Sequence, residues 1–375
     1  MSDVAASSPP RAPLVPAHLR GPLLGGGIAL GLVLLVALLA AAGVIAPRSV
    51  AHDVLVAPFV EMVELPDLFI QTIWEGFVAG VLYSLIALGF VLIFKASGVF
   101  NFAQGIMVVF AGLTLVGLYE VMTGRLGLPT GPAVGFLALL LTIAVMFLLA
   151  SAVERVVLRP LINQPDIILF MATFGLTYFL IGFGESVFGG NPKRMISDAL
   201  LLPSGSLTWE FGGGRVIFQK IDIAAAIISV LMIAALAAFF QYTRIGRALR
   251  AVADSHKAAL SVGISLNQIW VIVWFAAGVV ALVTGIMWGA RSDVSFALST
   301  IALKALPVLI LGGFTSVPGA IVGGLIIGIG EKIGEGYWGR LVGGGIETWF
   351  AYVIALGFLL IRPQGLFGDK IIERV

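Results

Sequence analysis

Long runs without a charged side chain constrain this chain more than any other feature. Stretches free of Asp, Glu, Lys and Arg cover 21–47, 76–94, 96–119, 126–153, 167–184, 223–243, 258–290 and 305–330, and 341–361 holds a single Glu. A membrane-crossing helix needs about 20 mostly apolar residues. Hydrophobic residues make up 59% of the 375 residues and charged residues only 11%, too few charges to cover a soluble protein of this size. The sequence therefore predicts an all-α, polytopic bundle of membrane helices.

The stretch 305–330 is interpreted as two elements, because Pro307 and the Gly312-Gly313 pair interrupt it. We expect a short half-span near 303–313 and a helix near 318–335. This division gives about ten membrane-crossing segments, including broken or short helices, with both termini on one side. Basic clusters at 244–257 and 362–374 favour a cytoplasmic location for both termini.

Four regions follow from composition. Residues 1–22 are Pro-rich and polar, which predicts a disordered cytoplasmic tail. Residues 23–66 are predicted to form an additional, uncleaved N-terminal transmembrane helix over the apolar run 23–46 and a linker, since the apolar core of a signal peptide is only about 7–15 residues long. The alternative is a cleaved segment, because Ala-rich residues precede Arg48. The main transmembrane domain then covers 67–365, and 366–375 forms a second cytoplasmic tail.

Small residues recur at helical spacing in two places. Gly76, Gly80 and Ser84 share one face, and Gly-x3-Gly pairs follow one another between Gly319 and Gly334. Such faces allow helix backbones to approach closely. They indicate either packing within the chain or a subunit interface or pore-lining face.

A charged segment lies between two long apolar spans, at 241–263. Arg244, Arg247, Arg250 and Asp254 are spaced by three and four residues and so share one helical face, opposite an apolar face that includes Leu249. This pattern predicts a short amphipathic helix at the membrane surface. The helix is either a solvated interfacial segment or a docking site for a soluble partner.

Several motifs, taken in order, resemble those of the branched-chain amino acid ABC transporter permeases, and the LivH-type subunit more than its LivM-type companion. The first two motifs are Val99-Phe-Asn-Phe-Ala-Gln-Gly and Arg155-Val-Val-Leu-Arg-Pro-Leu. The third is Thr243-Arg-Ile-Gly-Arg-Ala-Leu-Arg-Ala, which is followed by Ala258-Ala259 and Gly263-Ile264. The last two are Leu311-Gly-Gly-Phe-Thr-Ser-Val-Pro-Gly-Ala-Ile-Val-Gly-Gly and Arg362-Pro-Gln-Gly-Leu-Phe-Gly. The resemblance covers roughly residues 70–370.

The resemblance implies a permease subunit of an importer in the bacterial inner membrane, with no catalysis and no cofactor of its own. The implied partners are a second, LivM-like permease, two LivG/LivF-like ATPase subunits, a periplasmic solute-binding protein and membrane lipids. No Gly-x4-Gly-Lys-Ser/Thr motif occurs, so ATP and Mg are expected on the partner ATPase subunits. The segment 241–263 matches the family's coupling loop, which implies ATPase-coupling roles for Arg244, Arg247, Arg250, Ala251, Asp254, His256, Ala259 and Gly263.

Two departures from the family pattern matter. The family motif commonly continues Asn-Phe-Ala-His-Gly-Glu, whereas here Gln104 and Ile106 replace the His and the Glu. A titrating role at this place is therefore in doubt. The N-terminal ~65 residues also extend beyond the family's usual start.

Polar residues within the apolar spans are candidates for the solute path, since such residues are costly to bury in a bilayer. We expect Asn101, Phe102 and Gln104 to line that path, with Thr173, Thr177 and Glu75 as further candidates. The alternatives are hydrogen bonding between helices for Asn101 and Gln104, and a hydrated interfacial carboxylate for Glu75. The loop 191–220, which holds several basic residues, is predicted to help dock the binding protein or to be simply solvated.

The main competing function is an ion-coupled secondary transporter for a small polar solute. Such transporters commonly need ionisable groups near the midplane, and here the charges cluster near span ends. An embedded enzyme is disfavoured, because no catalytic Ser/His/Asp arrangement is legible, and His18, His52 and His256 suggest no metal site. A net charge of +2 gives no sign of nucleic-acid binding.

The resemblance implies aliphatic amino acids as the first candidates for the solute. Urea, short amides and aromatic acids are the alternatives, since related permeases handle them.

Overall fold

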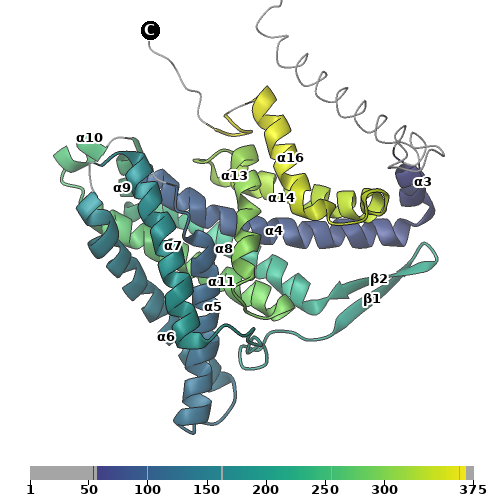
Figure 1. The fold of residues 1–375 in the computed structure, drawn as a ribbon, viewed down its shortest axis with the longest axis horizontal. Coiled ribbons are helices and arrows are strands. Elements are labelled where there is room, and N and C mark those ends of the chain that lie inside the picture. Colours follow the sequence, from purple (N-terminus) through teal and green to yellow (C-terminus); the bar gives the residue numbers. More distant parts are fainter. Residues whose placement is uncertain are drawn as a thin grey trace, which may run out of the picture.

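The computed structural model describes residues 54, 57–98, 100–161, 164–254, 256–362 and 364–368. Within these ranges the chain is mainly helical (Figure 1). The predicted tail 1–22, the predicted first span near 23–46 and the end of the predicted tail 366–375 lie outside the described residues.

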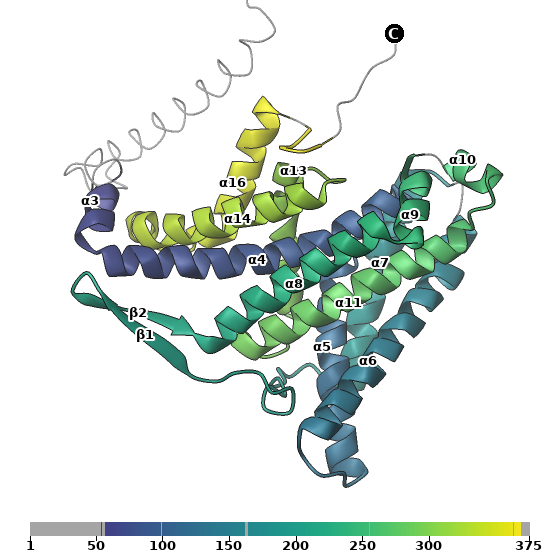
Figure 2. The same ribbon diagram turned by 180° about the vertical axis from the view of Figure 1, so that it is seen from behind.

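The central element is α4 (Pro66–Ser97), which crosses the whole molecule (Figures 1 and 2). Pro66 stands at its start, where the missing N–H is not needed and the fixed φ suits a helix. Gly98 ends it in the left-handed conformation (φ +71°), with its N–H donated to the Phe94 carbonyl at 2.7 Å. The helix therefore ends just before the segment that holds Asn101 and Gln104.

The other elements lie on the two sides of α4 and at its ends. On one side of α4 are α5, α6 and α7; on another are α13, α14 and α16 (Figures 1 and 2). In chain order the elements are α3 (Ala57–Glu64), α4, α5 (Gln104–Glu120) with the π-helical η1 (Val121–Arg125), α6 (Pro132–Ala152) with η2 (Val153–Leu158) and η3 (Arg159–Leu161), α7 (Asp166–Phe188), β1 (Ser206–Phe211), β2 (Gly214–Gln219), α8 (Lys220–Tyr242), α9 (Arg244–Asp254), α10 (His256–Ser261), α11 (Leu266–Ser292), α12 (Leu298–Leu303), α13 (Ala305–Gly312), α14 (Val317–Ile333) with η4 (Gly334–Trp338), α15 (Gly339–Val342) and α16 (Ile346–Ile361).

The glycine faces meet each other within the chain. A Cβ on Gly328 would lie 2.4 Å from the Gly80 Cα, and one on Gly80 would lie 2.7 Å from the Gly324 carbonyl oxygen. The backbones of α4 and α14 therefore touch, and no side chain larger than hydrogen fits between them. Of the two interpretations of these faces, packing within the chain is confirmed.

Seven helices in the described residues are long and apolar enough to cross a membrane. They are Pro66–Ser97, Gln104–Arg125, Pro132–Leu161, Ile167–Phe188, Lys220–Tyr242, Leu266–Ser292 and Val317–Val342. Leu298–Gly312 and Ile346–Ile361 are shorter apolar helices, and the first of these matches the expected half-span before Gly313. A polytopic helical membrane bundle is thus confirmed, while the count of ten crossings stays a prediction.

The all-α prediction is wrong in one segment. Within the expected loop 191–220, β1 and β2 form an antiparallel hairpin, whose register pairs Ser206 with Gln219 and Phe211 with Gly214. Gly212 and Gly213, both at positive φ (62° and 87°), supply the two-residue turn that suits the twist of a hairpin. The hairpin lies along the first half of α4, on the side away from α14 (Figures 1 and 2).

Candidate functional site

Asn101 and Gln104 follow the end of α4 and are both 0% exposed. Asn101 accepts the backbone N–H of Ala103 at 3.1 Å, a bond that shapes the turn into α5. Gln104 donates from Nε2 to the Ala277 carbonyl on α11 at 3.3 Å, while its Oε1 has no hydrogen-bond partner among the described residues. Its amide group lies against Gly89, where a Cβ would come within 2.2 Å of Nε2. These contacts connect α4, α5 and α11.

Thr173 and Thr177, from α7, lie beside the same turn. The Thr173 hydroxyl accepts the Phe102 N–H at 3.1 Å, and Thr177 donates to the Thr173 carbonyl at 3.0 Å. The Phe102 ring packs against Phe174, with centroids 5.0 Å apart. The structure therefore brings five of the six predicted path residues together: Asn101, Phe102, Gln104, Thr173 and Thr177. A contact of these groups with solute stays a prediction.

Glu75 is not part of this group. It accepts a hydrogen bond from Gln71 Nε2 at 2.8 Å, and the side-chain oxygen of Gln71, Oε1, in turn accepts the Ile217 N–H of the hairpin at 2.8 Å. The Gln104 side chain contacts α4 at Gly89, which lies 14 residues after Glu75 on that helix, or about 21 Å along its axis. Glu75 thus belongs to the junction between α4 and β2.

The amphipathic helix expected near residue 250 is present as α9. Its apolar side, which includes Leu249 and Val252, is buried in the main core. Arg250 points back to α8, where it donates to the carbonyls of Phe240 and, at 3.4 Å, of Gln241. Cationic donors at the last carbonyls of a helix satisfy groups that lack helical partners.

The other predicted coupling residues lie along the same segment. Arg244 and Arg247 are exposed, although Arg247 also approaches the Tyr242 carbonyl at 3.4 Å. Asp254 ends α9 and His256 begins α10. Ala251 is half-buried, Ala259 is buried, and Gly263, at φ +81°, forms the turn into α11. These residues therefore lie on one short segment, of which Arg244 and Arg247 are exposed while Ala259 is buried.

A cavity of about 600 Å³ opens beside α9. Four parts of the chain line it: the end of α4 with Lys95 and Gly98, α9 with Arg250, the turn 315–318 and Phe367. The lining residues include two basic side chains and no acidic one. The cavity is therefore suited to an anionic group or to an acidic surface of a partner.

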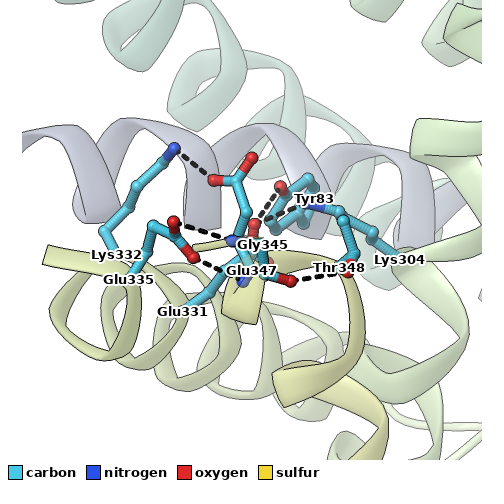
Figure 3. Close-up of polar contacts among 8 residues, drawn as sticks. All are labelled: Tyr83, Lys304, Glu331, Lys332, Glu335, Gly345, Glu347 and Thr348. Atoms are coloured by element: carbon cyan, nitrogen blue, oxygen red, sulfur yellow. Dashed lines mark hydrogen bonds and ion pairs between the residues drawn. The ribbon is translucent and has the colours of Figure 1, made fainter. Parts of the chain in front are cut away.

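The bundle also contains a cluster of charged residues that the sequence did not predict (Figure 3). Lys304 pairs with Glu331 at 2.5 Å, and the Tyr83 hydroxyl donates to the same Glu331 oxygen at 3.2 Å. Nearby, Lys332 pairs with Glu347 at 2.7 Å. Glu335 accepts the N–H groups of Gly345 and Glu347 and so caps the start of α16 (Figure 3).

The sequence contains one indication of this cluster, in the positions of Lys304 and Glu331. Lys304 directly precedes the uncharged stretch 305–330 and Glu331 directly follows it, a pattern typical of charges at the ends of spans. Only the folded chain shows that they meet. In the described residues no group of three or more His, Cys, Asp or Glu side chains is placed to hold a metal ion.

The fold and these sites define a multi-pass helical membrane protein with ionisable groups inside its bundle and a basic helix at one end. Residues 72–362 match the family of permease components of branched-chain amino acid transport systems, and the chain belongs to that family. It is accordingly a permease component, a membrane subunit without catalytic chemistry.

Two curated relatives are similar over most of this chain. The high-affinity branched-chain amino acid transport system permease BraD of Pseudomonas aeruginosa is 27% identical over 83% of this chain and 100% of its own. The high-affinity branched-chain amino acid transport system permease LivH of Escherichia coli (strain K12) is 27% identical, and the alignment covers 82% of this chain and 98% of LivH. A solved structure, PsaBC from Streptococcus pneumoniae in complex with Fab, aligns with 81% of this chain and 93% of that one, at 11% identity and a TM-score of 0.40.

Proposed function

We propose that this chain is one of two pore-forming subunits of an ATP-driven importer for branched-chain amino acids or similar small solutes. Partner ATPase subunits hold ATP and Mg and hydrolyse the nucleotide, and a binding protein delivers the solute. The family match and the relatives' named systems support this proposal. The second permease subunit is expected to be of the LivM type.

The observation that supports ATP coupling most directly is α9. It is anchored by its apolar side and by Arg250, and it keeps Arg244 and Arg247 exposed. A helix that is fixed to the bundle and charged on its exposed face can transmit the movement of a soluble partner to α8 and α11. The basic cavity beside it widens the surface available to an acidic partner.

The cavity also supports the topology of ten crossings. One cavity is lined by Gly98, Arg250, Ser316 and Phe367, which supports a topology with all four on one side of the membrane. Four helices separate Gly98 from Arg250, namely α5, α6, α7 and α8, and an even number returns the chain to its starting side. Between Arg250 and Ser316 lie α11 and the short helix Leu298–Gly312. The number of crossings between these two residues is even only when Leu298–Gly312 is counted as a crossing. With the predicted span near 23–46, the total is ten and both termini are cytoplasmic.

The domain division that we propose is the predicted one. The permease transmembrane domain covers 67–365, with the coupling loop at 241–263, preceded by the tail 1–22 and the additional helix and linker 23–66, and followed by the tail 366–375. The family match over 72–362 is consistent with the main domain.

Purification and transport measurements test this function. Tagged chain, extracted from its own cells, should copurify with an ATPase and a second permease. Proteoliposomes that contain this complex should accumulate labelled leucine only with ATP and the binding protein. Uptake that persists without ATP, and stops when the ion gradient is collapsed, would contradict the proposal and support a secondary transporter.

A further inference from the structure

The Lys304–Glu331 pair lies deep within the bundle, beside the middle of α4. Tyr83, which contacts Glu331, stands 17 residues after the start of α4 and 14 before its end. Glu331 is 1% exposed and the Lys304 side chain 18% exposed. Charged groups at such depth are costly, and a buried ion pair adds little stability compared with apolar residues of the same volume. A role beyond stability is therefore worth seeking.

The backbone around the pair is irregular. Lys304 joins α12 to α13, two short helices that replace one continuous span. Three residues after Glu331, α14 changes into the π-helical η4. Broken helices at membrane depth commonly surround solute sites in transporters, and π-helical turns are frequent at functional sites.

Both charged groups keep hydrogen-bonding capacity. The second carboxylate oxygen of Glu331, Oε2, has no hydrogen-bond partner among the described residues. The Lys304 ammonium has three N–H donors, and within the described residues it donates one hydrogen bond, to Glu331 Oε1. A ligand with one ammonium and one carboxylate would match both groups.

Apolar and aromatic side chains surround the pair. Tyr83, Ala302, Ala305 and Ile327 pack in one cluster, and Trp288 stacks on Tyr83 with ring centroids 6.0 Å apart. A solute with a charged head and a short aliphatic body therefore fits this environment better than a fully polar one.

We propose that Lys304 and Glu331 bind the zwitterionic head group of an α-amino acid as it passes through the permease. The Lys304 ammonium donates to the α-carboxylate, and Glu331 accepts from the α-ammonium. The proposal rests on the proposed function and narrows its solute class to amino acids with both groups free, rather than urea or amides.

The test measures leucine uptake per ATP hydrolysed by the complete importer in proteoliposomes. The variants are Lys304→Gln, Glu331→Gln, the charge exchange Lys304→Glu with Glu331→Lys, and the neutral pair Lys304→Met with Glu331→Gln. Lys332→Gln with Glu347→Gln is the matched control, because this neighbouring pair also joins α14 to another element but is partly exposed. All proteins are first checked for assembly with the ATPase.

Each site variant should lower uptake per ATP about tenfold or more, which corresponds to the loss of a charged hydrogen bond to the solute. The charge exchange should assemble as the wild type does but should not restore uptake, since it reverses the polarity presented to the solute. The control pair should stay within about twofold of wild type, as expected for partly exposed ion pairs.

Three results would overturn the proposal: wild-type uptake by the neutral pair, recovery of uptake by the charge exchange, or failure of every site variant to assemble. The last two would make the pair a structural connection only. If the wild-type complex itself imports no leucine with ATP, the proposed function fails instead, so the two failures are distinguishable.

Discussion

Gln104 occupies the space that the absent side chain of Gly89 leaves between two helices. An added Cβ at Gly89 would lie 2.2 Å from the Gln104 Nε2 and 2.7 Å from its Cδ. We predict that Gly89→Ala lowers the free energy of unfolding by about 1–3 kcal/mol, the usual range for overpacking. Thermal unfolding of the detergent-solubilised protein would measure the change.

The control and the partner variant make this prediction specific. The control is Gly182→Ala on α7, where the new Cβ meets no atom within 4 Å beyond the backbone of its own helix, so the change should be neutral or slightly stabilising. In the double variant Gly89→Ala with Gln104→Ala, the clash is removed, and the two effects should be less than additive. Strict additivity would contradict the contact.

At the scale of elements, α9 combines two roles on one short helix. Arg250 satisfies carbonyls at the end of α8, whereas Arg244 is exposed. We predict that Arg250→Ala lowers stability by about 1 kcal/mol, the typical net value of a hydrogen bond, while Arg244→Ala leaves the melting temperature unchanged. Arg244→Ala should instead reduce the ATPase recovered on copurification. Equal effects of both variants on stability would argue against this division.

The contact between α4 and α14 gives a second prediction at this scale. A Cβ on Gly328 would meet the backbone of Gly80, at 2.3 Å from its N and 2.4 Å from its Cα. Backbone atoms cannot move aside as the end of Gln104 can. Gly328→Ala should therefore destabilise the protein more than Gly89→Ala, by about 3 kcal/mol or more, measured by the same unfolding experiment. A smaller effect at Gly328 would show that the two helices separate easily.

The sequence predicted those elements that depend on local pattern and missed those that depend on contacts between distant segments. Apolar runs located the spans, and the spacing of the arginines located α9. The hairpin is the exception, because Ser206–Phe211 alternates polar and apolar residues before three glycines, a local pattern typical of a strand and a turn, yet the prediction placed it within one loop. The inward role of Arg250 and the meeting of Lys304 with Glu331, 27 residues apart, depend on tertiary packing, which spacing alone does not encode.

At the scale of the whole molecule, the chain's lack of cysteine makes its sidedness directly measurable. Exposed Thr208 on the hairpin and Val262 after α10 are separated by one helix long enough to cross the membrane, α8. We predict that Thr208→Cys reacts with a membrane-impermeant maleimide in intact cells. Val262→Cys should react only after the membrane is permeabilised. Equal labelling of both in intact cells would mean that α8 does not cross.

Phe367→Cys decides how the short helices are counted. Between Val262 and Phe367 lie α11, the pair α12–α13, α14 with its extensions, and α16. If Leu298–Gly312 crosses the membrane, the number of crossings is even and Phe367→Cys should behave as Val262→Cys does. If that segment enters and returns, the number is odd and Phe367→Cys should label in intact cells as Thr208→Cys does. We expect the first result, because half-exposed Phe367 lines the same cavity as Arg250, as two residues on one side of the membrane would.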